Sequence, residues 1–243
     1  GNGTYTNDWT LSGAGSAIAT DNNNTLSGVL SGNGGLTKTG TGTLTLTGNN
    51  TYAGGTAIND GTLKGNIASG TDLSIAAGAI YDGDNKARSV DGLNGGGKLL
   101  NTSGLTVQSG DFAGIIDNSN TSLTKTGAGT LTLSGTNTYT GMTTVRSGTL
   151  ALGSKLTSSQ LTLYGGTVFD RGSHNHSLDN GILSVNGVNG QSAMYKGDLS
   201  ARNATLNFIS PVHPTQPLLR VTGDTDVSGS ACNVGLAGGT SLA

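Results

Sequence analysis

Short runs of alternating residues recur along the chain, with leucine, isoleucine or valine at every second position and threonine or serine between them. Examples are residues 43–47, 73–75, 105–107, 130–133 and 161–163. Because successive side chains of a β-strand point to opposite sides, each run places its apolar residues on one face. Clusters of glycine, asparagine and aspartate between the runs favour tight turns. The pattern predicts many short strands, with core positions at Leu44, Leu46, Leu131 and Leu133.

Two stretches, residues 36–63 and 123–150, are copies of one another. They read LTKTGTGTLTLTGNNTYAGGTAINDGTL and LTKTGAGTLTLSGTNTYTGMTTVRSGTL, are identical at 19 of 28 positions and lie 87 residues apart. In the first copy we expect strands at 43–47, 55–59 and 62–64. Three strands and three corners in about 20–24 residues make one coil of a right-handed parallel β-helix.

The distance between the copies corresponds to about four coils of about 22 residues, so the chain should make roughly 11 coils of an elongated, all-β rod. We expect one β-helical unit over 1–243, with loop excursions at about 170–198 and 209–217. All three prolines lie in the second excursion, and proline donates no hydrogen bond to a strand ladder. A hairpin sandwich is the competing fold, but the strands are very short and the repeat is translational.

The composition supports a thin core and argues against several classes of function. Of 243 residues, 43 are glycine, 33% are hydrophobic and 11% are charged, whereas an ordinary globular domain has about 25% charge. The net charge of −2 and the scattered lysines and arginines argue against nucleic-acid binding. No apolar run approaches the length of about 18 residues that a transmembrane helix needs. The single cysteine, Cys232, excludes an intramolecular disulfide and is expected to be a half-buried strand residue.

Two candidate metal sites can be assembled from the sequence. His174 and His176 would share one face of a strand, with Asp170 and Asp179 nearby as further ligands of a divalent metal. A polar surface corner explains the same residues, and we prefer it. The stretch 82–85 resembles the start of a calcium-binding loop, but the ligands that an EF-hand needs farther along are missing. We therefore expect a solvated turn there and no bound metal.

Candidate catalytic residues are equally sparse. Ser228 and Ser230 have no evident histidine base, so we expect them to be turn serines. Carboxylates and cations gather locally in one stretch, which holds Asp82, Asp84, Lys86, Arg88 and Asp91. Polysaccharide lyases and hydrolases need such a cluster. Since the other acidic residues mostly stand singly at turns, we expect no enzymatic activity, no catalytic site and no cofactor.

The repeated string LTKTGxGTLTLxGxNTYxGxTxxxxGTL at 36–63 and 123–150 resembles the passenger-associated repeat of Gram-negative type V autotransporters. The stretches 204–208 and 218–230 are similar to passenger β-helix sequence as well. The resemblance implies a right-handed β-helix that crosses the periplasm and reaches the cell surface, or is secreted, through its own C-terminal β-barrel. The sequence shows neither an initiator methionine nor a signal peptide, so we expect a piece of a longer passenger.

Many passengers of this class are adhesins, some of them self-associating, and the resemblance implies an adhesive role here. The partners would be other copies on neighbouring cells, or glycans or matrix of a host surface, contacted along the outer faces and loops. Hydroxyl and amide ladders offer many weak hydrogen bonds, so a long face is needed for a firm contact. A structural stalk that projects another passenger domain and aids secretion is the alternative.

Overall fold

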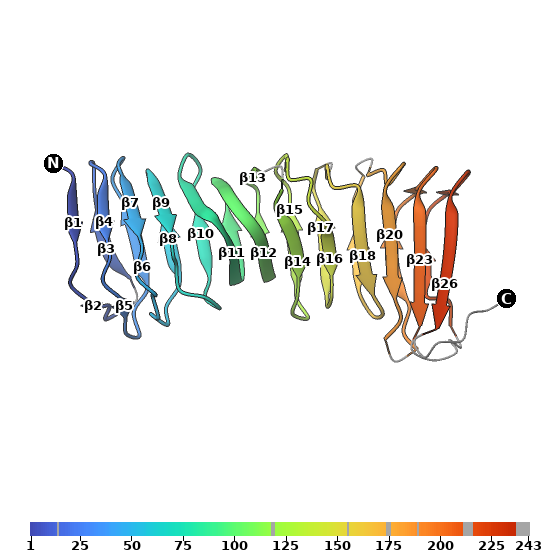
Figure 1. Cartoon of the computed structure of the whole chain (residues 1–243), viewed down its shortest axis with the longest axis horizontal. Helices are drawn as coiled ribbons and strands as arrows, with labels where there is room; N and C mark the ends of the chain where they lie inside the picture. Colours follow the sequence, from blue (N-terminus) through green and yellow to red (C-terminus); the bar gives the residue numbers. More distant parts are fainter. Residues whose placement is uncertain are drawn as a thin grey trace.

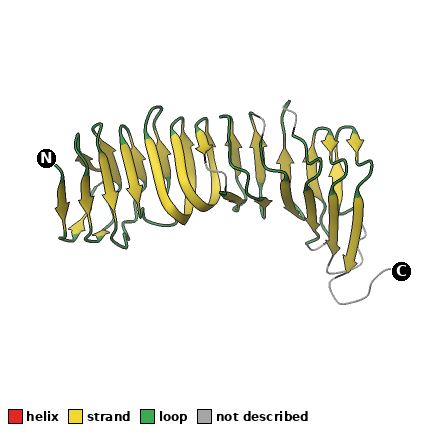
Figure 2. Cartoon of the chain, turned by 45° about the horizontal axis from the view of Figure 1, so that its top comes forward, coloured by secondary structure: helices red, strands yellow, loops and turns green. Residues whose placement is uncertain are grey.

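The chain folds into a rod of stacked β-coils (Figure 1). The computed structural model describes residues 1–13, 15–117, 120–154, 156–173, 176–188, 190–210 and 216–236. These residues contain strands and no helix, and they wind through about 10 turns of a right-handed parallel β-helix. Strands β1 (Gly3–Tyr5) and β26 (Ala231–Leu236) lie at opposite ends of the rod, which curves in a second view (Figure 2). The fold class predicted from the sequence is therefore confirmed.

The strands stack in three rows, which we call the first, second and third sheets. The first sheet contains β1, β4 (Asn24–Leu26), β7 (Thr43–Leu46), β9 (Thr62–Gly65), the beginnings of β11 (Ile80–Gly95) and β12 (Lys98–Phe112), and β13 (Ile115–Asp117). The second sheet contains the middles of β11 and β12, followed by β14 (Ser122–Lys125), β16 (Thr143–Val145), β18 (Gln160–Tyr164), β20 (Ile182–Asn186), β23 (Thr205–Ser210) and β26.

The third sheet closes each coil. It contains β3 (Ser16–Ala19), β6 (Leu36–Thr39), β8 (Thr56–Ile58), β10 (Leu73–Ile75), the ends of β11 and β12, β15 (Thr130–Leu133), β17 (Thr149–Leu152), β19 (Val168–Asp170), β21 (Ala193–Lys196) and β24 (Leu219–Val221). Two short pairs complete the stack, β2 (Trp9–Thr10) with β5 (Leu30–Ser31) and β22 (Leu199–Ser200) with β25 (Thr225–Asp226). The long strands β11 and β12 pass through all three sheets and so join them.

The coils differ in length, and this changes how the two sequence copies are related. Four coils beyond Leu36 the chain reaches Gly110, by the registers through Thr56, Leu73 and Leu93, and the fifth coil reaches Leu131. The second copy begins between Gly110 and Leu131, at Leu123 in β14. The expected spacing of four whole coils is therefore wrong, because stacked residues lie only 17 positions apart where Lys98 meets Ile115.

As a consequence, the two copies occupy different sheets. Residues 43–46 form β7 of the first sheet, whereas the equivalent residues 130–133 form β15 of the third sheet. Each sheet offers the same alternation of inward and outward positions, so one sequence fits either of them. The repeat thus encodes a strand–corner–strand unit and not a fixed place in the coil.

The core is a narrow column of apolar side chains inside the three sheets. The four leucines expected there, Leu44, Leu46, Leu131 and Leu133, are at most 1% exposed. The threonines between them point outward and are half-buried. Leucine stacks on leucine from coil to coil, Leu44 on Leu63 and Leu131 on Leu150, which confirms the predicted orientation of these strands.

The two expected excursions contain regular strands. Within 170–198, β20 and β21 continue the second and third sheets, and only a short loop with a bridge between Val188 and Gln191 separates them. At 209–217, β23 extends to Ser210, and residues 211–215 lie outside the described part. Within 170–198 regular strands thus reach farther than the sequence predicted, whereas the excursion at 209–217 stays a prediction.

Cys232 is exposed, so the expectation of a half-buried residue is wrong. It lies in β26 next to Leu206, in a row whose earlier members face the core. No coil of the described residues stacks beyond β26, so this core-facing position is open to solvent.

Replacing Leu131 with aspartate should lower the free energy of unfolding by several kcal/mol, because it buries a charge without a partner. The control is Thr132→Asp, which adds the same charge on the outward side of the same strand. Urea unfolding followed by circular dichroism measures both variants. A Leu131→Asp midpoint equal to that of the unchanged protein would contradict the assigned orientation of β15.

Candidate functional site

The repeat buries its lysine. Lys38 and Lys125 occupy the same place in the two copies, and both are 0% exposed. The Lys38 ammonium donates hydrogen bonds of 2.8, 2.6 and 3.2 Å to the carbonyls of Thr39, Gly40 and Asp60. The Lys125 ammonium donates to the three equivalent carbonyls of its own corner. Each lysine therefore gathers acceptors from two successive coils, and burial lowers the pKa of both.

The tyrosine of the repeat is a second buried polar group. The Tyr52 hydroxyl lies 2.6 Å from Oγ1 of Thr56, and the Tyr139 hydroxyl lies 3.1 Å from Oγ1 of Thr143. Burial raises the pKa of both tyrosines, and it raises that of Tyr195 to about 12. The threonine four residues after each tyrosine thus supplies the partner that a buried hydroxyl requires.

A glycine completes the corner. Gly61 and Gly148 have φ angles of 64° and 67°, and a Cβ on Gly61 would lie 2.5 Å from the carbonyl oxygen of Gly40. Lysine, tyrosine and glycine of the repeat are thus explained by the structure of its corners. The burial of these lysines was not predicted from the sequence, although their equal positions in the two copies were a usable signal.

The outer face of the second sheet carries a row of polar side chains in register. Its members are Ser89, Thr106, Thr124, Thr144, Thr162, Ser184, Asn207 and Asn233, of which only Thr144 is buried, at 4% exposed. Figure 1 shows the strands of its later part, β14, β18, β20, β23 and β26, side by side. Near the end of the row the Asn233 amide donates to Oδ1 of Asn207 at 2.9 Å. We call this row the polar row.

The surface around the polar row has little charge. In the described strands β14, β16, β18, β20 and β23 no outward side chain is charged. Ile182 and Ile209, beside the row, are 38% and 43% exposed. At its border the Arg146 guanidinium lies over the Tyr164 ring, 5.0 Å from the ring centroid. The second sheet therefore presents a surface of hydroxyl, amide and apolar groups.

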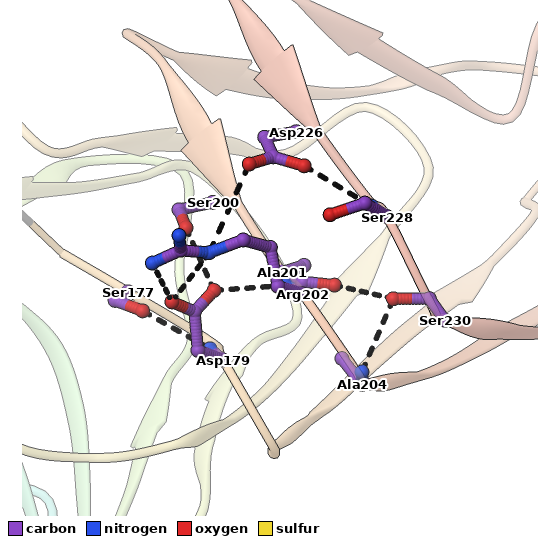
Figure 3. A network of polar contacts seen from close by, with 9 residues as sticks. All are labelled: Ser177, Asp179, Ser200, Ala201, Arg202, Ala204, Asp226, Ser228 and Ser230. Carbon is purple, nitrogen blue, oxygen red and sulfur yellow. Dashed lines mark hydrogen bonds and ion pairs between the residues drawn. The ribbon is translucent and has the colours of Figure 1, made fainter.

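Charges gather instead in a groove beside the pair β22 and β25, near the C-terminal end of the rod (Figure 3). There Asp179 Oδ2 accepts hydrogen bonds from Nε and Nη2 of Arg202 at 3.0 and 2.6 Å. Asp179 Oδ1 accepts from the Ser200 hydroxyl at 2.7 Å. Arg202 Nε also lies 3.8 Å from Oδ2 of Asp226. The Arg202 guanidinium holds the pKa of Asp179 far below its usual range.

This groove has a volume of about 490 Å³ and contains a second ion pair, 2.8 Å between Arg171 Nη2 and Asp198 Oδ2. Asp179, Arg202 and Asp226 come from three successive coils. Both guanidiniums are therefore engaged by carboxylates of this chain. The groove thus connects neighbouring coils, and only Asp179 of its charged residues was singled out in the sequence.

The structure does not bring the candidate metal ligands together, and His176 does not lie at the polar surface corner that the sequence favoured. His176 is 3% exposed, and its Nδ1 and Nε2 lie 3.2 Å from the Tyr195 hydroxyl and 3.1 Å from the Ser158 carbonyl oxygen. His176 is thus a core residue that packs against Phe169. His174 lies outside the described residues.

The carboxylates expected beside the histidines have other partners. Asp170 pairs with Lys196 at 3.3 Å, and Asp179 belongs to the groove. Among the residues that the structure describes, no group of three or more histidine, cysteine, aspartate or glutamate side chains is arranged to hold a metal ion.

The acidic cluster at 82–91 is divided as well. Asp84 pairs with Lys64 at 3.1 Å, Asp82 Oδ1 accepts from the Asp84 amide at 2.9 Å, and Asp91 accepts from the Gln108 amide. Asp84 has a φ angle of 55°, which is typical of a turn. The cluster therefore does not form one group of facing carboxylates.

Ser228 and Ser230 lie in a turn, as expected (Figure 3). The Ser228 amide donates to Oδ1 of Asp226 at 3.1 Å. The Ser230 hydroxyl donates to the carbonyl of Ala201 at 2.5 Å and accepts from the Ala204 amide at 3.1 Å. Ser230 thus fastens the turn to the preceding coil.

Parts of the chain match known sequences. Residues 36–64 and 123–152 match the family model of the passenger-associated-transport-repeat. In an alignment 156 positions long, which covers 57% of this chain, the chain is 42% identical to the adhesin BmaC autotransporter of Brucella suis biovar 1 (strain 1330). The two matches support a passenger fragment of a type V autotransporter. Passengers of this class lie at the cell surface or are secreted, beyond the Gram-negative outer membrane.

The passenger relative is much larger than this chain, which spans 4% of its length. No solved structure matches the chain. Within the described residues there is no apolar helix of membrane-spanning length.

Replacing Lys125 with methionine should lower the free energy of unfolding by about 1–3 kcal/mol, because it leaves buried carbonyls without their donor. Lys98→Met is the control, since Lys98 is exposed. Urea unfolding of both variants checks the effect. If Lys98→Met costs as much as Lys125→Met, the corner bonds do not explain the lysine of the repeat.

Alkaline pH should weaken the fold through the buried tyrosines. Between the ordinary tyrosine pKa of about 10 and the raised folded value, the unfolded state loses its proton first, so stability falls as pH rises. The stability difference between the unchanged protein and Tyr139→Phe should therefore shrink from about pH 9 to about pH 11.5. Unfolding curves across this range measure it, and a constant difference would refute the raised pKa of Tyr139.

Proposed function

We propose that this passenger segment is adhesive and binds a second copy of itself through the outer face of the second sheet. The observation that carries the proposal is the polar row, which runs in register over eight stacked strand segments from Ser89 to Asn233. The adhesin name of the Brucella relative supports an adhesive role. We assign no enzymatic reaction to the chain.

The chemistry of the face favours a contact between identical surfaces. Hydroxyl and amide groups both donate and accept hydrogen bonds, so the same row on two copies is self-complementary. The absence of charge from the outward positions of β14, β16, β18, β20 and β23 avoids like-charge repulsion between the two copies. Exposed Ile182 and Ile209 add apolar area at the side of the row.

The strength of such a contact depends on its length. A net hydrogen bond contributes about 1 kcal/mol or less, so one or two coils bind weakly. A rigid rod presents many of these groups at once, and many rods on one surface multiply the effect. The face thus fits a contact between surfaces that carry many copies.

The double substitution Thr124→Lys/Thr162→Lys should abolish the clustering of beads coated with the chain, because it brings like charges together in the contact. Both threonines are half-buried, outward members of the polar row. The matched control is Thr37→Lys/Thr132→Lys, which adds the same charges to the outer face of the third sheet. Light scattering of bead suspensions gives the measurement.

The outcomes separate the candidate roles. Beads that cluster, and that disperse only with the second-sheet variant, support the homotypic contact. Beads that stay dispersed with the unchanged chain but bind coated host matrix support a host-directed adhesin. Beads that do neither leave the structural stalk as the remaining role.

A further inference from the structure

A polar pocket opens at the corner between the first and second sheets, in the N-terminal half of the rod. It has a volume of about 370 Å³, and its lining includes Asn49, Asn66, Ser69, Lys86 and Arg88. Its two charged residues are both cations, although the chain carries a net charge of −2. The pocket is thus the place where the cluster at 82–91 presents its positive charge.

Arg88 is held in a fixed position at this pocket. Its Nη1 donates to Oδ1 of Asn66 at 3.1 Å, and its Nη2 donates to the Gly83 carbonyl at 2.8 Å. Asn66 is itself anchored, because its amide donates to the carbonyls of Thr47 and Gly48 at 3.3 Å. Arg88 Nε is buried and has no hydrogen-bond partner. The two Nη groups carry four N–H donors, and the bonds to Asn66 and Gly83 use two of them, so Arg88 retains donors besides the buried Nε.

The rim of the pocket is open. Lys86, Asn49 and Ser69 are exposed, and in the described part of the chain their side chains make no hydrogen bond or ion pair. The carboxylate that could neutralise the corner, Asp84, is engaged by Lys64 outside the pocket. The corner therefore combines one fixed cation, one free cation and free amide and hydroxyl groups.

We propose that this pocket binds an acidic saccharide, with its carboxylate or sulfate on Arg88 and Lys86. Charge-assisted hydrogen bonds to an anion are stronger than neutral ones, and arginine presents its donors in a planar fork. The amide of Asn49 and the hydroxyl of Ser69 suit the hydroxyl groups of a sugar, since both donate and accept. Two cations are fewer than the cluster that an anionic membrane surface requires, which favours a saccharide over a lipid.

This inference goes beyond the adhesive contact between copies, because it concerns another ligand and another surface of the rod. The pocket includes Lys86 and Arg88 in the middle of β11, beside the N-terminal end of the polar row at Ser89, whereas the uncharged part of the second-sheet face begins at β14. A passenger with both surfaces would join cells to each other and to acidic glycans.

Isothermal titration of the full chain tests the proposal with four probes: a sulfated disaccharide, a disaccharide of uronic acid, a neutral disaccharide and inorganic sulfate. We expect one or both acidic disaccharides to bind and the neutral one not to bind. Comparing the first two distinguishes sulfate from carboxylate recognition. Binding by inorganic sulfate alone would show an anion site without saccharide recognition, and that result, like no binding by either acidic disaccharide, overturns the proposal.

Substitutions locate the site. Lys86→Ala should weaken binding about tenfold and Arg88→Gln should abolish it, because each removes a charge that pairs with the anion. Lys98→Ala, another exposed lysine, should leave the affinity unchanged. Circular dichroism verifies folding, and Lys86→Ala carries the test if Arg88→Gln unfolds. Unchanged affinity in Lys86→Ala overturns the proposal.

The bead assay keeps the two proposals apart. Lys86→Ala should cluster beads as well as the unchanged chain, because Lys86 is not a member of the polar row and lies before the uncharged strands β14 to β23. Loss of saccharide binding with clustering retained supports the pocket independently. Failure of the unchanged chain to cluster beads, with saccharide binding intact, would contradict only the homotypic contact.

Discussion

Parallel stacking of each strand on the coil before it governs this protein. Neighbouring strands lie about 4.8 Å apart, so each coil contributes only one thin layer to the core, and stability adds up from coil to coil. This explains how 33% hydrophobic residues suffice for a folded chain. The same geometry brings the corners of successive coils on top of one another, where backbone carbonyls would be buried without donors. The corners, and not the strands, therefore need the most specific residues.

The repeated sequence supplies those residues. Lys38 and Lys125 each place an ammonium among three backbone carbonyls. The hydroxyls of Tyr52 and Tyr139 each lie within hydrogen-bond distance of the threonine four residues later in the chain. A buried polar group without a partner costs about 1–3 kcal/mol, so these positions tolerate little change. Strand positions demand only the right polarity. The two copies therefore stay similar where their residues form the corners.

Because the interior side chains are used for stacking, binding has to take place on the outer surface of the rod. This surface differs in chemistry from place to place. The second sheet presents the uncharged polar row, the corner at Arg88 presents cations, and the groove at Asp179 pairs its charges across coils. A rod separates such surfaces along its length and around its circumference. One passenger segment thus has room for a contact with a second copy of itself and for a separate ligand site of different chemistry.

The sequence by itself determined the fold class, because alternation with period two and glycine-rich corners leaves few architectures besides a stack of short strands. It also determined which leucines are buried. The tertiary structure decided the length of each coil, and with it the sheet that each copy occupies. Stacked residues lie between 17 and 26 positions apart, and the local sequence pattern does not reveal this number. The same holds for the surfaces. Asp84 and Arg88 are close in sequence, but they contact different residues of the neighbouring coil. Asp84 pairs with Lys64, and Arg88 donates to Asn66.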